Sequence, residues 1–205
     1  MQRFRNIIFD LGGVILNLDY RRTSTAFQKL GLQSFDEIYS QVQQSGLFDA
    51  YEKGLIGSAA FRETLAEHLP AGTVHEKIDE AWNAMLLDLP PERLEKLEAL
   101  GKTHRIFLLS NTNEIHIRAF TEILRRDFGI ESLSALFEKE YFSFRVGMRK
   151  PDVEIFQHVL LENGLSAAET LFLDDSPQHV EGGRRAGLTA RLVNGPGILD
   201  DGYYR

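Results

Sequence analysis

Polar side chains that could bind ions stand directly after three short apolar runs of the chain. These side chains are Asp10, Ser110, Asp174 and Asp175, and the runs before them are residues 6–9, 106–109 and 171–173. If the runs are neighbouring parallel strands, their carboxyl ends lie along one edge of a sheet, where ligands bind in folds of this kind. The carboxylates would then form a cation site, and the hydroxyl with nearby helix amides would suit phosphate oxygens.

Three carboxylates at one edge of a sheet need positive charge to balance them. Two carboxylates about 4 Å apart repel by roughly 4 kcal/mol at an effective dielectric constant near 20. Lys150 stands directly before Pro151, at the start of a predicted helix, and the loop that carries it could reach the same edge. A divalent cation and this lysine would together balance the three negative charges. Because the ligands are oxygens and the chain has no cysteine, Mg²⁺ is the expected metal.

Each of these residues also has an ordinary structural role open to it. Ser110 could cap the helix that follows it, and Lys150 could be a solvated surface lysine. The Asp174-Asp175 pair could complement the dipole of the next helix. The four segments that contain Asp10, Ser110, Lys150 and Asp174-Asp175 nevertheless all occur at a strand end or a helix start. This shared position favours one common site over separate coincidences.

The elements that would position these residues alternate between short apolar runs and helical patterns. Strands are predicted at 6–9, 106–109, 141–144, 171–173 and 190–193, and helices at 90–101, 115–124, 151–161 and 177–186. Runs that are apolar throughout and separated by helices predict an α/β fold with a doubly wound parallel sheet, buried on both faces.

Residues 17–89 have a different pattern, in which apolar residues recur at helical spacing and no convincing strand occurs. Two such sets are Phe35, Ile38 and Val42, and Phe61, Leu65 and Leu69. We expect a small helical bundle inserted after the first strand, so that residues 1–16 and 90–205 form the α/β unit.

The composition narrows the classes of function. Of the 205 residues, 43% are hydrophobic and 26% are charged, as in an ordinary folded protein. The net charge of −7 argues against nucleic-acid binding, so an anionic ligand would need a locally positive pocket. No apolar run is long enough to span a membrane, and no signal peptide is evident before the first strand. We expect a cytoplasmic monomer or weak homodimer without membrane or nucleic-acid partners.

The four segments resemble the motifs of the haloacid dehalogenase-like hydrolase superfamily. The matching stretches are Asp10-Leu11-Gly12-Gly13-Val14, Leu108-Leu109-Ser110-Asn111, Lys150-Pro151 and Leu173-Asp174-Asp175-Ser176. The resemblance covers nearly the whole chain and implies a Rossmann-like core, with residues 17–89 as an inserted helical cap. The branch that the chain is most similar to contains small bacterial sugar-phosphate phosphatases, including α-glucose 1-phosphate phosphatases.

The resemblance also implies a role for each motif residue in the hydrolysis of a small phosphorylated metabolite. Asp10 would be the nucleophile that forms an aspartyl-phosphate, with Lys150 beside it. Ser110, Asn111 and Lys150 would bind the transferring phosphoryl group. The magnesium ligands would be Asp10, Asp174, Asp175 and the backbone carbonyl of Gly12. Substrate contacts from the start of the cap are expected from Tyr20 and Arg21.

One position departs from the phosphatase pattern. Phosphatases of this superfamily usually have a second aspartate, a general acid and base, at the position of Gly12. General acid–base catalysis is worth about a hundred- to ten-thousandfold in rate. Either the leaving group is acidic enough to depart unaided, as an anomeric hydroxyl is, or another group takes this role. The candidates are Glu114, His116 and His179.

Two other functions remain compatible with the missing aspartate. A metal-independent dehalogenase also lacks it, although the pair Asp174-Asp175 without a metal would repel an anionic substrate. A non-catalytic protein that binds Mg²⁺ and phosphate is the third alternative. Activity towards an activated phosphate ester that is lost on chelation would separate the three.

Overall fold

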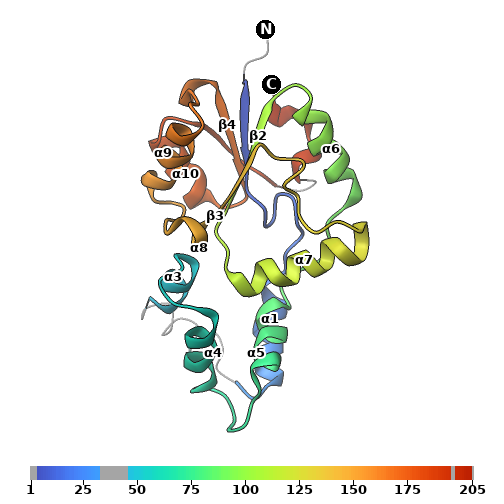
Figure 1. Ribbon diagram of the computed structural model, residues 1–205, viewed down its shortest axis with the longest axis vertical. Helices are drawn as coiled ribbons and strands as arrows, with labels where there is room; N and C mark the ends of the chain where they lie inside the picture. Colours follow the sequence, from blue (N-terminus) through green and yellow to red (C-terminus); the bar gives the residue numbers. More distant parts are fainter. Residues whose placement is uncertain (1–3, 33–45, 195–196, 205) are drawn as a thin grey trace.

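The computed structural model describes residues 4–32, 46–194 and 197–204, which form an α/β core and a helical unit below it in Figure 1. The core contains one sheet of five parallel strands in the order β3-β2-β1-β4-β5. The strands are β1 (Asn6–Phe9), β2 (Arg105–Ser110), β3 (Lys139–Phe142), β4 (Thr170–Asp174) and β5 (Thr189–Leu192). The predicted doubly wound α/β fold is confirmed, with the first strand at the centre of the sheet.

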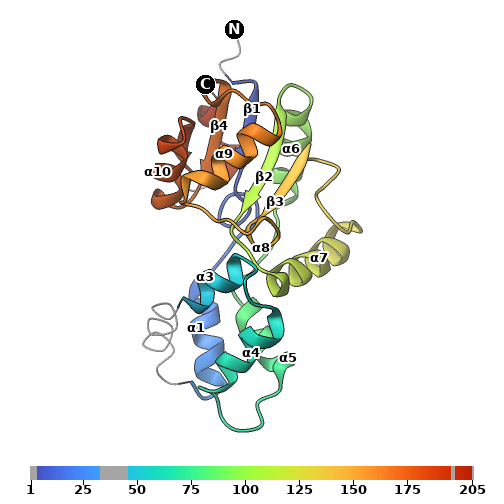
Figure 2. The same cartoon turned by 60° about the vertical axis from the view of Figure 1, so that its left-hand side comes forward.

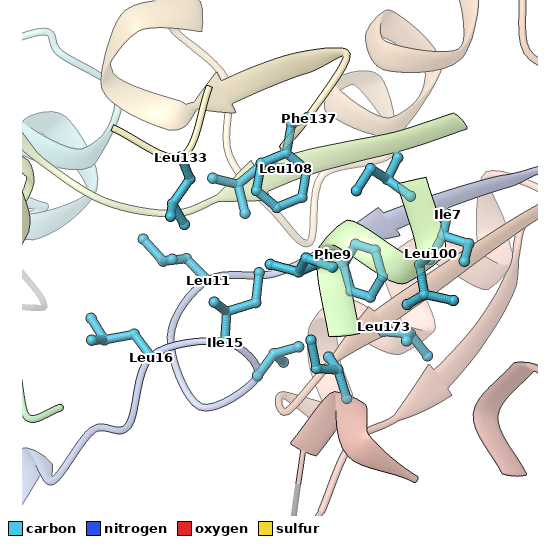
Figure 3. Packing of buried hydrophobic residues seen from close by; sticks show 14 of the residues in the cluster. Ile7, Phe9, Leu11, Ile15, Leu16, Leu100, Leu108, Leu133, Phe137 and Leu173 are labelled. Atoms are coloured by element: carbon cyan, nitrogen blue, oxygen red, sulfur yellow. The ribbon is translucent and has the colours of Figure 1, made fainter. Parts of the chain in front are cut away.

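Alternate residues of each strand enter two separate apolar layers. On β1, Ile7 and Phe9 pack with side chains of α6 (Pro91–Gly101) and α7 (Glu114–Phe128), in the layer drawn in Figure 3. Ile8, between them, packs in the other layer, with α9 (Val153–Glu162) and α10 (Pro177–Arg185). Because the sheet is covered on both faces, the central strands β1, β2 and β4 are mainly apolar, whereas the edge strands β3 and β5 also carry charged residues such as Lys139 and Arg191.

The third strand begins and ends earlier in the chain than predicted. The sequence favoured a strand at 141–144, but β3 ends at Phe142, and Ser143 begins the short helix α8 (Ser143–Val146). The Ser143 hydroxyl accepts a hydrogen bond from the Thr112 amide (3.0 Å) and donates one to the Thr112 carbonyl (3.0 Å). These bonds anchor the end of β3 to the loop after β2, and the chain turns there instead of continuing.

The described residues between the first strand and α6 form a helical unit with a core of its own. Its described helices are α1 (Tyr20–Lys29), α3 (Leu47–Glu52), α4 (Ser58–Ala66) and α5 (His75–Asn83), seen side by side in Figure 2. Phe61 lies at the centre of an aromatic cluster with Phe48, Tyr51 and Trp82. The predicted helical set Phe35, Ile38 and Val42 lies outside the described residues.

The two chain segments that connect this unit to the core run side by side. Asn17 and Leu87 share a backbone hydrogen bond of 3.0 Å, and Leu18 and Leu86 form an isolated antiparallel bridge. A second contact between this unit and the core lies at Gly54, whose φ of +66° and whose approach to the Phe144 carbonyl leave no room for a Cβ.

Short 3₁₀ helices complete the core at Ala167–Glu169, Gly197–Leu199 and Asp201–Tyr204. No helix in the described ranges has the length and apolar character needed to cross a membrane.

Candidate active site

The parallel register brings the predicted motif residues to one edge of the sheet. Phe9 of β1 pairs with Leu108 of β2 and with Leu173 of β4, so the residues that follow these three positions lie next to one another. Asp10 therefore stands between the ends of β2 and β4, close to Asp174. The sequence-based expectation of a common site rested on this geometry, and the strand pairing provides it.

Lys150 joins the two carboxylates. Its side chain is fully buried, and Nζ donates hydrogen bonds to Asp10 Oδ1 (2.7 Å), Asp174 Oδ2 (2.7 Å) and the Leu109 carbonyl (2.8 Å). The three ammonium protons are thus all used. A buried lysine with this set of partners is not the solvated side chain that was the alternative interpretation of Lys150.

The side chain of Asn111 holds the backbone of Lys150 at both of its polar groups. Asn111 Nδ2 donates to the Lys150 carbonyl (2.8 Å), and Asn111 Oδ1 accepts from the Lys150 amide (2.9 Å). The amide group of Asn111 therefore positions the lysine, which sequence reasoning did not foresee. Ser110, at the end of β2, is buried, and its Oγ has only a long contact of 3.5 Å to the carbonyl of Asn111.

Burial and mutual interaction shift the pKa values of the charged groups at this edge. Burial raises the pKa of Asp10 to about 7 against the opposing effect of Lys150, and the neighbouring Asp174 adds to the increase. Burial also opposes ionisation of Asp174, but Lys150 and His179 outweigh it and lower its pKa to about 2. Burial disfavours the ammonium of Lys150, yet the two carboxylates raise its pKa. One lysine thus faces two buried carboxylates and leaves this edge of the sheet short of positive charge.

A third carboxylate completes a cluster that could hold a cation. Oxygen atoms of Asp10, Asp174 and Asp175 all lie within 4.8 Å of one another. Burial, followed by repulsion from Asp174, raises the pKa of Asp175. The Asp175 carboxylate packs closely against Gly13. The φ of Gly13 is +72°, and a Cβ at this position would lie 2.1 Å from Asp175 Oδ2, so only glycine fits there. The oxygen-only donor set and the excess of negative charge both fit Mg²⁺.

Two connected cavities lie between this edge and the helical unit. The first, here called the polar cavity, has a volume of about 420 Å³ and includes Asp10, Asp175, Ser176, His179 and Arg149 in its lining. The second, here called the apolar cavity, is smaller, about 130 Å³, and is lined mainly by hydrophobic side chains, together with Ser110 and Thr112. Both are also lined by Gly12, Leu18, Tyr20, Glu52 and Asn111.

The two predicted substrate contacts of the cap have different positions. Tyr20, the first residue of α1, lines both cavities, although much of its side chain is exposed. Arg21 lines neither of them and faces a separate surface depression with Arg22 and Lys29. Asp19 caps the helix and also accepts a hydrogen bond from Nε of the exposed Arg21 side chain (3.3 Å).

The three candidate replacements for the missing aspartate are all engaged elsewhere. Glu114 is exposed and accepts a hydrogen bond from Ser58 Oγ (2.5 Å). His179 Nδ1 lies 3.0 Å from Asp174 Oδ1. His116 lines the apolar cavity, but its ring stacks on Trp82 and its nitrogens contact the Trp82 carbonyl (3.2 Å) and the Asn113 side chain (3.1 Å).

Sequence reasoning missed two charged residues that meet at the cavities. Arg149 Nη1 donates to Asp49 Oδ1 of α3 (2.9 Å), and Arg149 Nη2 lies 3.0 Å from Glu52 Oε2 at the end of the same helix. Lys53, which follows Glu52, also pairs with Asp152 of the core (3.6 Å). The signal available in the sequence was the turn Glu52-Lys53-Gly54-Leu55-Ile56-Gly57, which resembles the loop that faces the active site in capped relatives, although neither Glu52 nor Arg149 was among the predicted site residues.

A family model described as haloacid dehalogenase-like hydrolase matches residues 4–187 of this chain. The chain is also similar to D-ribitol-5-phosphate phosphatase of Bacteroides thetaiotaomicron, with 30% identity over 186 residues. That match covers 90% of this chain and 89% of the relative.

Solved structures give the same grouping. A magnesium complex of a HAD family enzyme from Bacteroides thetaiotaomicron has a TM-score of 0.86 and 34% identity, and the match covers 98% of this chain and 96% of that one. A predicted HAD-like family hydrolase from Porphyromonas gingivalis has a TM-score of 0.83 and 28% identity, covering 97% of this chain and 94% of that one.

Proposed function

Because the chain belongs to the haloacid dehalogenase-like hydrolase family, we propose that it transfers a phosphoryl group from a small phosphorylated metabolite to Asp10 and then to water. The family match and the phosphatase name of its relative make the chain a phosphatase. The nucleophile, the magnesium dependence and the substrate are the parts we propose. A cytoplasmic location, a monomeric or weakly dimeric state and the division into a core of 1–16 and 90–205 and a cap of 17–89 stay predictions.

The observation that carries the proposal is the charge arrangement around Lys150. The lysine binds Asp10 and Asp174 at 2.7 Å each, while a third carboxylate, Asp175, lies in the same cluster. Phosphoryl transfer depends mainly on positioning and on stabilising charge, and a fixed carboxylate beside a buried cation supplies both.

Magnesium fits this cluster and would be held by Asp10, Asp174 and Asp175, with the carbonyl of Gly12 as a further proposed ligand. When bound, the ion supplies positive charge that lowers the repulsion between the carboxylates and an anionic substrate. The similar HAD family enzyme from Bacteroides thetaiotaomicron was solved as a magnesium complex, which supports the same cofactor here.

The residues of the chain itself orient the reaction. Lys150 holds Asp10 in place and offsets negative charge on the transferring group. The Asn111 side chain binds the backbone of Lys150, so we propose that Asn111 acts on the phosphate indirectly, by positioning this lysine. Ser110 lines the apolar cavity beside them, where we propose that its hydroxyl binds a phosphate oxygen. Tyr20 and the cavity walls would contact the leaving group, whereas Arg21 lines neither cavity.

The proposed substrate class is a sugar or polyol phosphate. A polar cavity of about 420 Å³ has room for a small polar metabolite next to Asp10. The related D-ribitol-5-phosphate phosphatase bears a polyol phosphate in its name, which supports this class.

The experiment is a screen of sugar and polyol phosphates, with p-nitrophenyl phosphate as an activated ester, in the presence of Mg²⁺. We expect release of inorganic phosphate that stops on chelation and is absent in Asp10→Asn. Halide release from a haloacid that persists with a chelator would instead support a dehalogenase. Binding of Mg²⁺ and phosphate without turnover of any ester would make the chain a non-catalytic binding protein.

A further inference from the structure

Position 12, where the family pattern would put an acidic side chain, is filled from elsewhere in the structure. Gly12 lines both cavities, and a Cβ built on it would lie 2.5 Å from Leu18 Cδ1. The methyl group of Leu18 thus occupies the space in which a side chain at position 12 would begin. A proton donor for the leaving group must therefore come from another part of the chain.

We propose that Glu52 of the cap is the general acid and base of the reaction. The proposal rests on the function proposed above for Asp10. Glu52 ends α3 and lines both the polar and the apolar cavity. In the lining of these two cavities, as far as the structure describes them, it is the only carboxylate besides Asp10 and Asp175.

Glu52 lies on the cap side of the polar cavity, which is the side on which a general acid is needed. Asp10 is part of the core, whereas Glu52 ends α3 of the helical unit, and both line the polar cavity. Figure 1 shows α3 at the end of the helical unit nearest the core. In an in-line phosphoryl transfer the leaving oxygen departs opposite the attacking carboxylate. The leaving oxygen therefore lies on the cap side of the phosphorus, and so does the water that later attacks the aspartyl-phosphate.

The carboxyl group of Glu52 is available for a proton. Oε2 is buried and has no hydrogen-bond partner among the described residues, although Arg149 Nη2 lies 3.0 Å away without hydrogen-bond alignment. Burial raises the pKa of Glu52; Arg149 and Lys150 oppose the shift, and Asp49 adds to it. The same cavities are also lined by the ionisable groups of Asp10, Asp175, His116, His179 and Tyr20. A carboxyl group that remains protonated closer to neutral pH is suited to act as an acid.

The other candidate groups are less suitable. His116 is held by Trp82 and Asn113, and burial lowers its pKa to about 4, so at neutral pH it carries no second proton to donate. His179 is bound to Asp174, and Glu114 lines neither cavity.

The proposed proton transfers balance over the two steps. As a carboxylate oxygen of Asp10 bonds to phosphorus and the ester P–O bond breaks, the proton of Glu52 moves to the leaving oxygen, which departs as an alcohol. In the second step the Glu52 carboxylate takes a proton from the attacking water. The oxygen of this water bonds to phosphorus as the bond between the Asp10 oxygen and phosphorus breaks. Inorganic phosphate leaves, and both carboxyl groups return to their initial states.

The test compares two substrates that differ in how much they need an acid. Glu52→Gln and wild type are measured with Mg²⁺ on a sugar phosphate that the wild type hydrolyses and on p-nitrophenyl phosphate, whose leaving group departs without a proton. We expect kcat/KM to fall by about a hundredfold or more on the sugar phosphate and by less than about threefold on p-nitrophenyl phosphate. A burst of p-nitrophenol is also expected, because the variant lacks the base for the second step.

Two variants serve as controls for folding and for charge. Asp49→Asn removes the other acidic partner of Arg149 from the same helix, outside the cavity linings, and should leave both substrates within about threefold of wild type. Glu52→Asp keeps a carboxyl group and should retain more activity on the sugar phosphate than Glu52→Gln.

Equal losses on both substrates in Glu52→Gln, or a rise in KM with kcat unchanged, would overturn the proposal and make Glu52 a substrate-binding residue. Absence of a burst would overturn its role as the base. Failure of the proposed phosphatase function would be seen separately, as wild-type protein without Mg²⁺-dependent activity on p-nitrophenyl phosphate.

Discussion

The core side and the cap side of the candidate site differ in how completely their polar groups are paired. On the core side, Lys150 uses all three of its protons and Asn111 both ends of its amide. On the cap side, Trp82 Nε1 is buried without a hydrogen-bond partner among the described residues, and Glu52 Oε2 has only the Arg149 guanidinium 3.0 Å away, without an aligned hydrogen bond. Arg149 Nε, where the core meets the cap, also lacks a hydrogen-bond partner there. Buried polar groups are normally paired within a protein, so the exceptions need an explanation. The difference indicates that the core fixes the reacting groups, whereas the cap offers groups for a substrate to bind.

Removing the lysine should have the largest effect on the core side. Lys150→Met leaves Asp10 and Asp174 buried without their shared cation, and breaking a buried ion pair from one side costs about 3–5 kcal/mol. We expect the free energy of unfolding, measured with urea, to fall by that amount. The control Lys77→Met removes an exposed ion pair with Glu80 and should cost less than about 1 kcal/mol. Equal losses in the two variants would contradict the account of the core side.

Magnesium should stabilise the core side by a smaller amount. At an Mg²⁺ concentration a hundred times its dissociation constant, stability should increase by about 2.7 kcal/mol, because binding favours the folded state. Asp175→Asn removes one proposed ligand and should abolish most of the magnesium-dependent rise in Tm. Glu95→Gln, which changes an exposed carboxylate of α6, should leave that rise intact. A magnesium response that survives Asp175→Asn would place the metal elsewhere.

The contact between core and cap should show its own dependence on pH through His116, a residue of α7 whose ring stacks on Trp82 of the cap. Burial lowers the pKa of this histidine from 6.5 to about 4. Between these two values the unfolded chain binds a proton that the folded chain does not, so stability is lost as pH falls through that window. Because the ring is partly exposed, we expect about 2 kcal/mol of this loss to disappear in His116→Gln. Equilibrium unfolding at pH 7 and pH 4 measures it, and identical pH slopes for the two proteins would contradict the expectation.

The same contrast separates what the sequence predicts from what it does not. The apolar runs that end in Asp10, Ser110 and Asp174 predict the core side, because strands buried on both faces must be apolar and parallel strands end at one edge. Glu52 could not be assigned in this way, since its position depends on how the cap packs against the core. Arg21 shows the same limit, because only the folded chain shows that it lines a depression separate from the two cavities.

The strand ends were less well predicted than the strands. The apolar stretch 141–144 continues past the observed end of β3 because the deciding contact, between Ser143 and Thr112, joins residues far apart in the sequence. The contact between Asn111 and Lys150 was not predicted, because it also joins residues that are far apart in the sequence, and Asn111 was expected at the phosphate. Only the folded chain shows that its side chain is bound to the backbone of Lys150.

The most direct test of the central claim is to trap the phosphorylated enzyme. The protein is mixed with Mg²⁺ and a hydrolysed substrate and quenched with acid, and peptide mass spectrometry then locates any added phosphoryl group. We predict one phosphoryl group on Asp10 in the wild type, a larger trapped fraction in Glu52→Gln, and none in Asp10→Asn. A phosphoryl group on another residue, or hydrolysis that continues in Asp10→Asn, would contradict the assignment of Asp10 as the nucleophile.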